Sequence, residues 1–375
     1  MKCKAVIARE DVAEFGWSEV ELDEPRADEI LVRIAGVGLC HTDLIARDQF
    51  IPVGSPAVLG HEGAGEVVKV GSAVTKVGPG DRVALSFRSC GACRSCADHM
   101  PSYCQHFGGL NMSGARPDGS KAVRLDGQPI SSNFFGQSSF AEYALAYESN
   151  VVRIEDDEVP LELLGPLGCG IQTGAGGVMR SLACPAGSSL LVVGGGSVGL
   201  AAVMGGAVQR CGTIIVVEPH AARRDLALEL GATHAIDPIG NDVAAAVRDI
   251  LPDGVEYAFD TTGRPDSFAA VLASLAVRGH FGMVSAQAAD TTITLDVNSF
   301  ILAGHHVQGI IEGDSDPDVF IPELIAHYKA GRFPYDRLVT TYPLADINRA
   351  IEDQHAGRCI KAVLIPDHGK GEAHD

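Results

Sequence analysis

The spacing of apolar and polar positions divides the chain into a first part of short strands and a second part in which strands alternate with helices. Up to about residue 150 the apolar runs are short, rich in β-branched residues and separated by Gly or Pro, which is typical of strands. Strands are predicted over residues 4–8, 30–37, 66–70 and 82–85. This part is therefore expected to form an irregular, β-rich domain.

From about Ile171 the apolar runs alternate with segments of helical period. Strands are predicted over residues 189–193, 213–217, 233–236, 255–259, 280–284 and 306–311, and helices over residues 198–210, 221–230 and 243–251. Two further helices, over residues 319–329 and 345–354, precede a final strand over residues 361–365. Strands that alternate with helices indicate a parallel, doubly wound sheet, so the predicted fold class is α/β.

The charge balance argues against two classes of partner. The 375 residues include 29 Lys and Arg against 48 Asp and Glu, which gives a formal net charge of −19. Such a charge repels nucleic acid and anionic lipid, so neither is expected as a partner. The uncharged stretch 181–209 is long enough to span a membrane, but its glycines favour a strand, a turn and a helix. The first eleven residues contain no apolar run typical of a secretory signal, which favours a cytoplasmic location.

Four of the ten cysteines lie close together, with two, two and seven residues between them: Cys90, Cys93, Cys96 and Cys104. Four thiolates with this spacing favour a closed, tetrahedral zinc site that stabilises a loop. An iron–sulfur cluster is the competing metal group, but the bacterial ferredoxin pattern has three residues before its fourth cysteine and a proline after it. Here there are seven residues and Gln105 follows. A loop with unmetallated cysteines is the third alternative.

A dinucleotide-binding fingerprint begins directly after the predicted strand 189–193. Gly194, Gly196 and Gly199 form Gly-x-Gly-x-x-Gly at the start of a predicted helix. In this context the first glycine allows a tight turn, the second lets the backbone approach a pyrophosphate, and the third lets the helix pack on the strand. Glu218, at the end of the next predicted strand, is placed to accept the ribose hydroxyls and would repel a 2′-phosphate. We therefore expect NAD, with NADP as the alternative because Arg223 and Arg224 lie nearby.

A second metal site would have to be assembled from distant positions, which spacing alone does not reveal. The candidates are Cys40-His41-Thr42-Asp43, Gly60-His61-Glu62 and Gly168-Cys169-Gly170. One histidine and two cysteines would leave a fourth position open for water or substrate, which is the arrangement of a catalytic zinc. Taken singly, each of these residues is more often a packing residue than a ligand.

Together these motifs resemble the zinc-dependent alcohol dehydrogenases of the medium-chain dehydrogenase/reductase superfamily, over essentially the whole chain. Gly60-His61-Glu62-Gly63-Ala64-Gly65, followed by Gly71 and Val74, is similar to the zinc signature of that family. The four-cysteine segment and the dinucleotide fingerprint lie where the family carries them. Residues 134–141 and 165–174 resemble the aryl-alcohol (benzyl-alcohol) dehydrogenase branch.

The resemblance implies a fold of two domains. A β-rich, GroES-like catalytic domain would contain residues 1–170 and 312–375, and a Rossmann domain of residues 171–311 would be inserted into it. The implied cofactors are NAD and two Zn²⁺ per chain, one catalytic and one structural. The implied assembly is a homodimer or homotetramer.

The resemblance also implies roles for individual residues. Catalytic zinc would be bound by Cys40, His61 and Cys169, with Asp43 and Glu62 behind them, and structural zinc by Cys90, Cys93, Cys96 and Cys104. Thr42 would take the proton of the substrate hydroxyl as a zinc-bound alkoxide forms, before hydride passes to the nicotinamide. Dinucleotide contacts would come from Thr173, His41, Lys361, Gly194, Gly195, Gly196, Ser197, Val198, Gly199, Glu218 and Arg223.

One position departs from the family pattern. Many members have a histidine five residues after the first zinc cysteine, which passes the alcohol proton to solvent, and here Ile45 occupies that position. Either the ribose hydroxyl releases the proton to water, or His41 takes part. His99, His106, His220, His305 and His306, and the cysteines Cys3, Cys184, Cys211 and Cys359, have no motif support and are expected to be packing or surface residues.

The leading interpretation is an NAD-dependent dehydrogenase that interconverts primary aromatic or allylic alcohols with aldehydes in an apolar pocket. The alternatives within the enzyme class are terpene alcohols, such as geraniol or perillyl alcohol, and short aliphatic alcohols. A protein that binds dinucleotide without turnover, in a structural or regulatory role, is the alternative from another class. The intact open metal site argues against that alternative, because a binding module does not need one.

Overall fold

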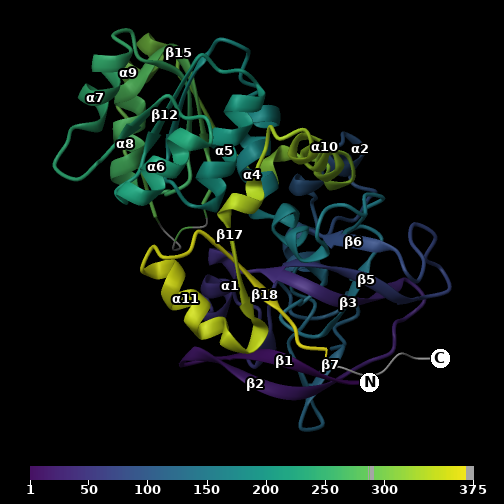
Figure 1. Ribbon diagram of the computed structural model, residues 1–375. Helices are drawn as coiled ribbons and strands as arrows, with labels where there is room; N and C mark the ends of the chain where they lie inside the picture. Colours follow the sequence, from purple (N-terminus) through teal and green to yellow (C-terminus); the bar gives the residue numbers. More distant parts are fainter. Residues whose placement is uncertain (286, 288–290, 369–375) are drawn as a thin grey trace. The chain divides into compact units, whose positions relative to one another are not determined.

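The computed structural model describes residues 1–285, 287 and 291–368, and its chain divides into two compact units (Figure 1). The first unit contains Met1–Asp98, Cys104–Cys169 and the residues from Leu338 onward, and the second contains His99–Tyr103 and Gly170–Arg337. The second unit therefore extends beyond 311, the last residue expected of the inserted domain. It does so because η6 (Glu312–Asp314) and α10 (Pro317–Lys329) pack on α4 (Gly170–Gly176).

The first unit is built on two sheets. The smaller has the strand order β4 (Ala57–Val58), β1 (Lys2–Arg9), β2 (Val12–Leu22), β7 (Val123–Leu125) and β8 (Gln128–Ile130). The larger has the order β10 (Val151–Arg153), β6 (Arg82–Leu85), β5 (Glu62–Val70), β3 (Glu29–Gly38), β18 (Lys361–Ile365) and β17 (Val339–Pro343), with β9 (Tyr143–Tyr147) also paired to β3. Since β18 pairs antiparallel with β3, the end of the chain completes a sheet begun near its start. The predicted β-rich first domain is confirmed.

Short helices and turns connect these strands and carry the candidate site residues. They are α1 (His41–Arg47), α2 (Arg94–Ala97), α3 (Phe107–Asn111), α11 (Ile347–His355), η2 (Phe134–Gly136), η3 (Leu161–Leu163), η4 (Gly165–Gly168) and η8 (Leu344–Asp346). The first unit has a continuous apolar core in which residues such as Ile30, Ile34 and Phe140 have no exposed surface. The core fixes the ends of β3, β5 and β6, where the candidate metal ligands lie.

The second unit contains a six-stranded, all-parallel sheet of the doubly wound type. Its strand order is β13 (His234–Ile236), β12 (Thr213–Val217), β11 (Ser189–Val193), β14 (Val255–Asp260), β15 (Leu275–Met283) and β16 (His306–Gly309). This is the 3-2-1-4-5-6 order of dinucleotide-binding sheets, so the α/β fold class is confirmed. In such a sheet ligands bind beyond the carboxyl ends of the strands, where the order reverses between β11 and β14.

Helices cover this sheet as the alternating pattern predicts. They are α5 (Ser197–Val208), α6 (Ala221–Glu229), α7 (Val243–Ile250), α8 (Pro265–Ser274) and α9 (Val297–Ala303). The second unit also contains η1 (Pro101–Tyr103), α4, the π-turn η5 (Gly177–Ser181), η6, α10 and most of η7 (Tyr335–Leu338). The uncharged stretch becomes β11, a turn and α5, which packs on β11 and β12. Across the described ranges, no helix has the length and apolar character needed to cross a membrane.

Candidate metal centres and dinucleotide site

Cys40 and Asp43 are held together at the start of α1. Cys40 is the N-cap residue of this helix, and its backbone N–H donates to Asp43 Oδ2 at 3.0 Å. An acidic residue three positions into a helix that accepts from the N-cap backbone satisfies an N–H group that the helix leaves without a partner. The same contact fixes the Asp43 carboxylate, which has no exposed surface.

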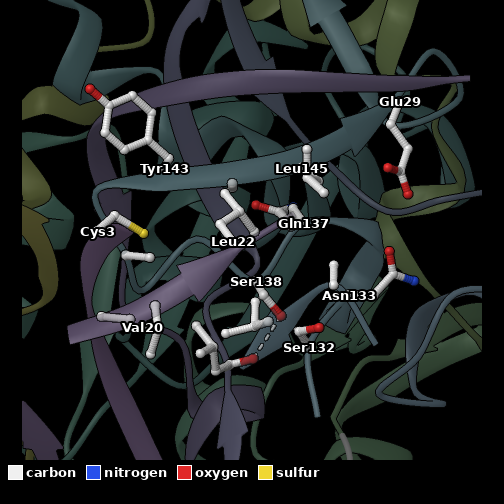
Figure 2. Close-up of a pocket in the computed structure, with 16 residues that line it drawn as sticks. Cys3, Val20, Leu22, Glu29, Ser132, Asn133, Gln137, Ser138, Tyr143 and Leu145 are labelled. Atoms are coloured by element: carbon white, nitrogen blue, oxygen red, sulfur yellow. Dashed lines mark hydrogen bonds between the residues drawn. The ribbon is translucent and has the colours of Figure 1, made fainter. Parts of the chain in front are cut away.

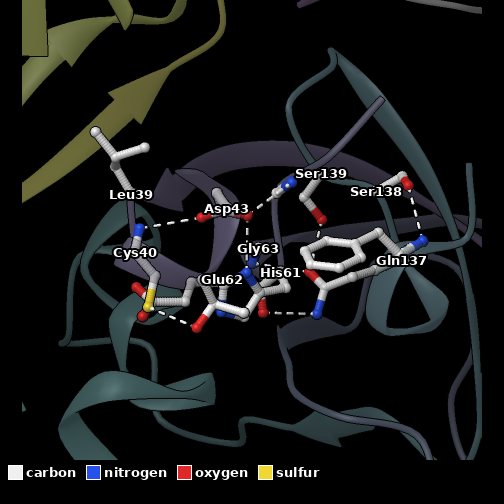
Figure 3. Close-up of polar contacts among 12 residues, drawn as sticks. Leu39, Cys40, Asp43, His61, Glu62, Gly63, Gln137, Ser138 and Ser139 are labelled. Atoms are coloured by element: carbon white, nitrogen blue, oxygen red, sulfur yellow. Dashed lines mark hydrogen bonds and ion pairs between the residues drawn. The ribbon is translucent and has the colours of Figure 1, made fainter. Parts of the chain in front are cut away.

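His61 lies directly before β5 and is oriented by Asp43 (Figure 3). Its Nδ1 is 2.8 Å from Asp43 Oδ1, which also accepts from the backbone N–H of Gly60 at 3.1 Å. The carboxylate therefore favours the proton on Nδ1 and leaves Nε2 as the free donor for a metal. Nε2 is buried and has no hydrogen-bond partner within the described part of the chain. A buried ring nitrogen without a partner is the observation that fits a metal ligand here.

Cys169 completes this group at the end of η4. The candidate ligand atoms of Cys40, His61, Glu62 and Cys169 all lie within 4.8 Å of one another. A hydrogen bond with Cys169 is the largest influence on Cys40, and lowers the pKa of its thiol well below the usual value although burial acts in the opposite direction. Burial is the largest single influence on His61 and lowers its pKa, but the charges and hydrogen bonds of Asp43 and Cys40 together outweigh burial and raise the pKa well above its usual value. These surroundings favour positive charge among the sulfur atoms, which a divalent metal would supply.

Glu62 forms a buried ion pair with Lys361 of β18. Lys361 Nζ lies 2.8 Å from Glu62 Oε1 and 2.7 Å from Oε2, and it also donates to the carbonyl oxygen of Leu39 at 3.3 Å. Burial raises the pKa of the Glu62 carboxyl, and the Lys361 charge offsets this only in part. The Lys361 side chain is 1% exposed and its ammonium group is directed at Glu62, while the pyrophosphate contact implied for Lys361 stays a prediction.

The four-cysteine group has the geometry of a closed metal site. Sulfur atoms about 2.3 Å from the centre of a tetrahedron are about 3.8 Å apart. The recorded separations are 3.5 Å between Cys93 and Cys96, and 4.0 Å for both Cys90–Cys96 and Cys93–Cys104. Backbone N–H groups donate to the sulfur atoms of Cys90 and Cys104, which favours thiolates. The four residues thus fit a structural zinc, and the two groups together are consistent with two zinc ions per chain.

The glycine fingerprint shapes a pocket of about 820 Å³ in the second unit. Gly194 has a φ of +98°, and a Cβ at Gly199 would lie 1.8 Å from Gly194 O, so both positions require glycine. Gly194, Gly195 and Gly196 line the pocket, whereas Ser197, Val198 and Gly199 form the first turn of α5. The motif therefore has the strand, turn and helix context that the sequence predicts.

Glu218 and Arg223 also line this pocket. Glu218 is 3% exposed, and its carboxylate accepts from the backbone N–H groups of Gly195 at 2.6 Å and His220 at 2.9 Å. Arg224 is held by the carbonyl oxygen of Glu218 and by Asp237, whereas Arg223 lines the pocket together with Arg264, which is paired with Asp266. His220, which was expected to be a surface or packing residue, also lines it.

The remaining predicted site residues lie on α1 and α4. Thr42 Oγ1 is 3.7 Å from Cys40 Sγ, and His41 is exposed at the first position of α1. Thr173 belongs to the second unit, where its hydroxyl lies 3.4 Å from Glu312 Oε2. Glu312 was not predicted, because a single acid after a strand gives no pattern. Gln137 and Ser86, which contact the backbone beside the metal ligands, were also missed, because a single polar residue gives no pattern in the sequence.

A smaller cavity lies in the first unit, beside β1, β2 and β9 (Figure 2). Its volume is about 20 Å³, and its walls include Cys3, Glu29 and Ser132. A space of this size holds about one water molecule. It is therefore too small for an alcohol substrate, and its one carboxylate, on Glu29, is already paired with Arg116.

Comparison with known proteins agrees with this arrangement. A model described as the alcohol dehydrogenase GroES-like domain matches residues 26–156, and one described as zinc-binding dehydrogenase matches residues 197–327. A geraniol dehydrogenase from Castellaniella defragrans is 45% identical over 97% of this chain and 98% of its own.

Two solved structures are similar over 98% of this chain and 100% of theirs. The alcohol dehydrogenase zinc-binding domain protein from Burkholderia ambifaria has a TM-score of 0.96 at 48% identity. The benzyl alcohol dehydrogenase from Acinetobacter calcoaceticus has a TM-score of 0.94 at 40% identity.

Proposed function

This chain belongs to the zinc-containing medium-chain alcohol dehydrogenases, and on that premise we propose that it oxidises primary aromatic or allylic alcohols reversibly to aldehydes with NAD. The observation that carries the proposal is the group formed by Cys40, His61 and Cys169, in which the buried His61 Nε2 has no other partner among the described residues. The fourth candidate ligand of this group, Glu62, is held in an ion pair with Lys361, and a site with three protein donors is typical of a catalytic rather than a structural zinc.

Several residues of the chain would take part in alcohol oxidation, each with a separate role. Bound zinc would act as a Lewis acid that lowers the pKa of the alcohol hydroxyl. Asp43 holds the His61 ring and the Cys40 backbone in the orientation that this requires. Thr42, two positions after Cys40, would accept the proton of the substrate hydroxyl while it passes its own hydroxyl proton on. His41, exposed beside Thr42, offers a route for that proton to solvent, since Ile45 cannot ionise.

NAD would accept the hydride from the alcohol carbon, and we propose NAD rather than NADP. The support is Glu218, whose buried carboxylate lies at the pocket formed by the glycine turn. A carboxylate at this position accepts hydrogen bonds from ribose hydroxyls and repels a 2′-phosphate. The alternative is NADP, and the observation in its favour is Arg223, whose Nε is buried and has no partner within the described residues.

The preference for an aromatic or allylic alcohol rests on the surroundings of His61. Its ring centroid lies 4.6 Å from that of Phe135 and 5.5 Å from that of Phe134. Aromatic rings interact favourably with other aromatic and unsaturated groups in edge-to-face or offset geometry. Similarity to both a benzyl alcohol dehydrogenase and a geraniol dehydrogenase supports the same range, with terpene alcohols as the alternative. Short aliphatic alcohols would gain little from such neighbours.

We also propose that the protein forms a homo-oligomer, either a dimer or a tetramer. β16 is the terminal strand of the described six-stranded sheet, so one row of its backbone N–H and C=O groups faces outward. Val277 and Leu302, in β15 and α9, are 76% and 84% exposed. A second copy of the chain would bury these apolar side chains.

The test is a comparison of kcat/KM for benzyl alcohol, geraniol, perillyl alcohol and ethanol, measured by NADH or NADPH absorbance with NAD and NADP in turn. We expect benzyl alcohol with NAD to give the highest value. The highest value with ethanol would refute the aromatic assignment, and a preference for NADP would refute the cofactor assignment. Dinucleotide binding without turnover of any alcohol would favour the non-catalytic alternative.

A further inference from the structure

The loop before β9 holds an unusual backbone conformation next to His61. Asn133, Phe135 and Ser138 have φ values of +65°, +52° and +57°, and Gly136 between them has a φ of +69°. A non-glycine residue in this left-handed region costs about 1–3 kcal/mol and persists only where the surroundings enforce it. All six residues from 133 to 138 are buried. We attribute this conformation to the side chain of Gln137, whose hydrogen bonds hold the loop in place.

The Gln137 amide forms four hydrogen bonds, three of them to backbone groups near the metal ligands (Figure 3). Its Nε2 donates to the carbonyl oxygens of His61 at 2.9 Å and Ser86 at 3.0 Å. Its Oε1 accepts from the backbone N–H of Gly63 at 3.0 Å and from Ser139 Oγ at 2.7 Å. Both amide hydrogens and both oxygen lone pairs are used. Gln137 therefore binds the backbone of the residues on both sides of Glu62.

Ser86 continues these contacts to the third metal ligand. It follows β6, and its hydroxyl donates to the carbonyl oxygen of Gly168 at 2.6 Å. Gly168 directly precedes Cys169, and a Cβ at Gly168 would lie 1.9 Å from the carbonyl oxygen of Leu85. The segment before Cys169 therefore packs closely on the end of β6, where the Ser86 hydroxyl binds it.

We propose that Gln137 and Ser86 are positioning residues that set the affinity of the catalytic metal centre, by tying the backbone of His61 to the backbone next to Cys169. The inference rests on the proposed catalytic site, although neither residue offers a ligand to it. Asp43 orients the imidazole ring, whereas Gln137 and Ser86 fix the distance between the two chain segments that carry His61 and Cys169. A metal site needs both, because a donor displaced by a few tenths of an ångström binds less strongly.

The chemistry of the amide makes the proposal specific to Gln137. In Gln137→Glu the side chain keeps its size and still accepts from Gly63 and Ser139, but it can donate to neither of the carbonyl oxygens of His61 and Ser86 when ionised, and to only one of them when protonated. Ser86→Ala removes the bond from its hydroxyl to the carbonyl oxygen of Gly168. Ser139→Ala is the matched control, since it is equally buried, lies in the same loop and loses the side-chain bond to Gln137, while its backbone N–H keeps its bond to the carbonyl oxygen of Gly60.

The experiment measures the zinc content of the full chain after dialysis against increasing EDTA, together with alcohol oxidation before and after zinc is added back. We expect Gln137→Glu and Ser86→Ala to lose one zinc at EDTA concentrations roughly 10- to 100-fold lower than the wild type. The zinc of the four-cysteine group, in the same unit, should be retained, and added zinc should restore the rate. Ser139→Ala should follow the wild type.

Two outcomes would overturn the proposal. One is that both variants retain zinc as the wild type does, and the other is that both zinc ions are lost together, which would show a general weakening of the first unit. Should Gln137→Glu not fold, Ser86→Ala alone decides, because it removes the hydroxyl bond to Gly168 and introduces no charge. Failure of the proposed function is distinguishable, since it would appear in the wild type as a missing second zinc or an absence of alcohol oxidation.

Discussion

Asp43→Asn tests whether the carboxylate behind His61 tunes the catalytic metal site. The Asp43 side chain has no exposed surface and accepts three hydrogen bonds from two segments of the chain. Oδ1 accepts from His61 Nδ1 and the backbone of Gly60, and Oδ2 accepts from the backbone of Cys40. Asparagine has the same size but only one oxygen, so one side of the carboxamide must present N–H groups to a donor. The substitution therefore changes hydrogen bonding and charge with little change in volume.

The magnitude follows from these contacts. If the amide oxygen serves His61 and Gly60, its NH₂ group faces the Cys40 N–H, and leaving buried donors unsatisfied costs about 1–3 kcal/mol. The remaining bonds lose their charge assistance, which roughly halves their strength. Removal of a carboxylate behind a histidine ligand typically lowers metal affinity roughly 10- to 100-fold, or about 1.4–2.7 kcal/mol. We therefore expect zinc at the Cys40 site to be lost at correspondingly lower EDTA concentrations.

The assay is zinc content against EDTA, with alcohol oxidation measured on the same samples. Asp81→Asn serves as the control, because Asp81 also accepts a backbone N–H, from Gly78 at 2.8 Å, but lies outside both candidate metal groups. Zinc retention and kcat equal to those of the wild type in Asp43→Asn would refute the role given to the carboxylate. Equal losses in Asp81→Asn would show that the effect is not local.

Three further substitutions test separate parts of the structure. A Cβ at Gly199 would lie 1.8 Å from a backbone oxygen, so Gly199→Ala should lower Tm by several degrees. A Cβ at Gly196 meets no described atom within 4 Å, so Gly196→Ala should keep Tm and weaken NADH binding, as measured by fluorescence titration. Equal effects on Tm would contradict this division of roles. Glu218→Gln should reduce the ratio of kcat/KM for NAD over NADP roughly 10-fold or more, since a neutral amide no longer repels a 2′-phosphate, and an unchanged ratio would count against the ribose contact. Burial raises the pKa of Glu29, but Arg116 together with hydrogen bonds from Arg26 and Tyr147 outweighs burial and lowers that pKa. The stabilisation is therefore present above the unfolded value of about 4.3 and is lost as the pH falls through the lower folded value. Urea unfolding should therefore show Glu29→Gln less stable than the wild type by about 3 kcal/mol at pH 7, with the difference shrinking in acid, and a difference independent of pH would refute the ion-pair explanation.

The parts of the fold that follow from local periodicity could be predicted from the sequence. The strands Ser189–Val193 and Thr213–Val217 have the predicted bounds, because a buried parallel strand is a continuous apolar run flanked by turn residues. α8 and α9 were not predicted, and β15 begins at Leu275 rather than at 280. The strand β15 contains Arg278 and Gly279, which interrupt the apolar run and conceal its first half.

The residues of the candidate site could be predicted from the sequence only where they are close in the chain or belong to a recognised signature. The four cysteines lie within one segment, so their spacing alone indicates a metal site. Cys40, His61 and Cys169 were identified by resemblance, because donors from three separate segments share no local pattern. The ion pair of Glu62 with Lys361 and the bonds of Gln137 had no signal at all, since such contacts form only after distant strands have paired.

Zinc content and alcohol oxidation of His61→Ala, measured on one preparation beside the wild type and Cys93→Ala, test the catalytic metal site most directly. We predict two zinc ions in the wild type and one in His61→Ala, which should bind NADH but oxidise no alcohol. Cys93→Ala should lose the zinc of the four-cysteine group instead. Retention of both zinc ions and of a wild-type rate in His61→Ala would contradict the assignment of Cys40, His61 and Cys169 as the catalytic metal site.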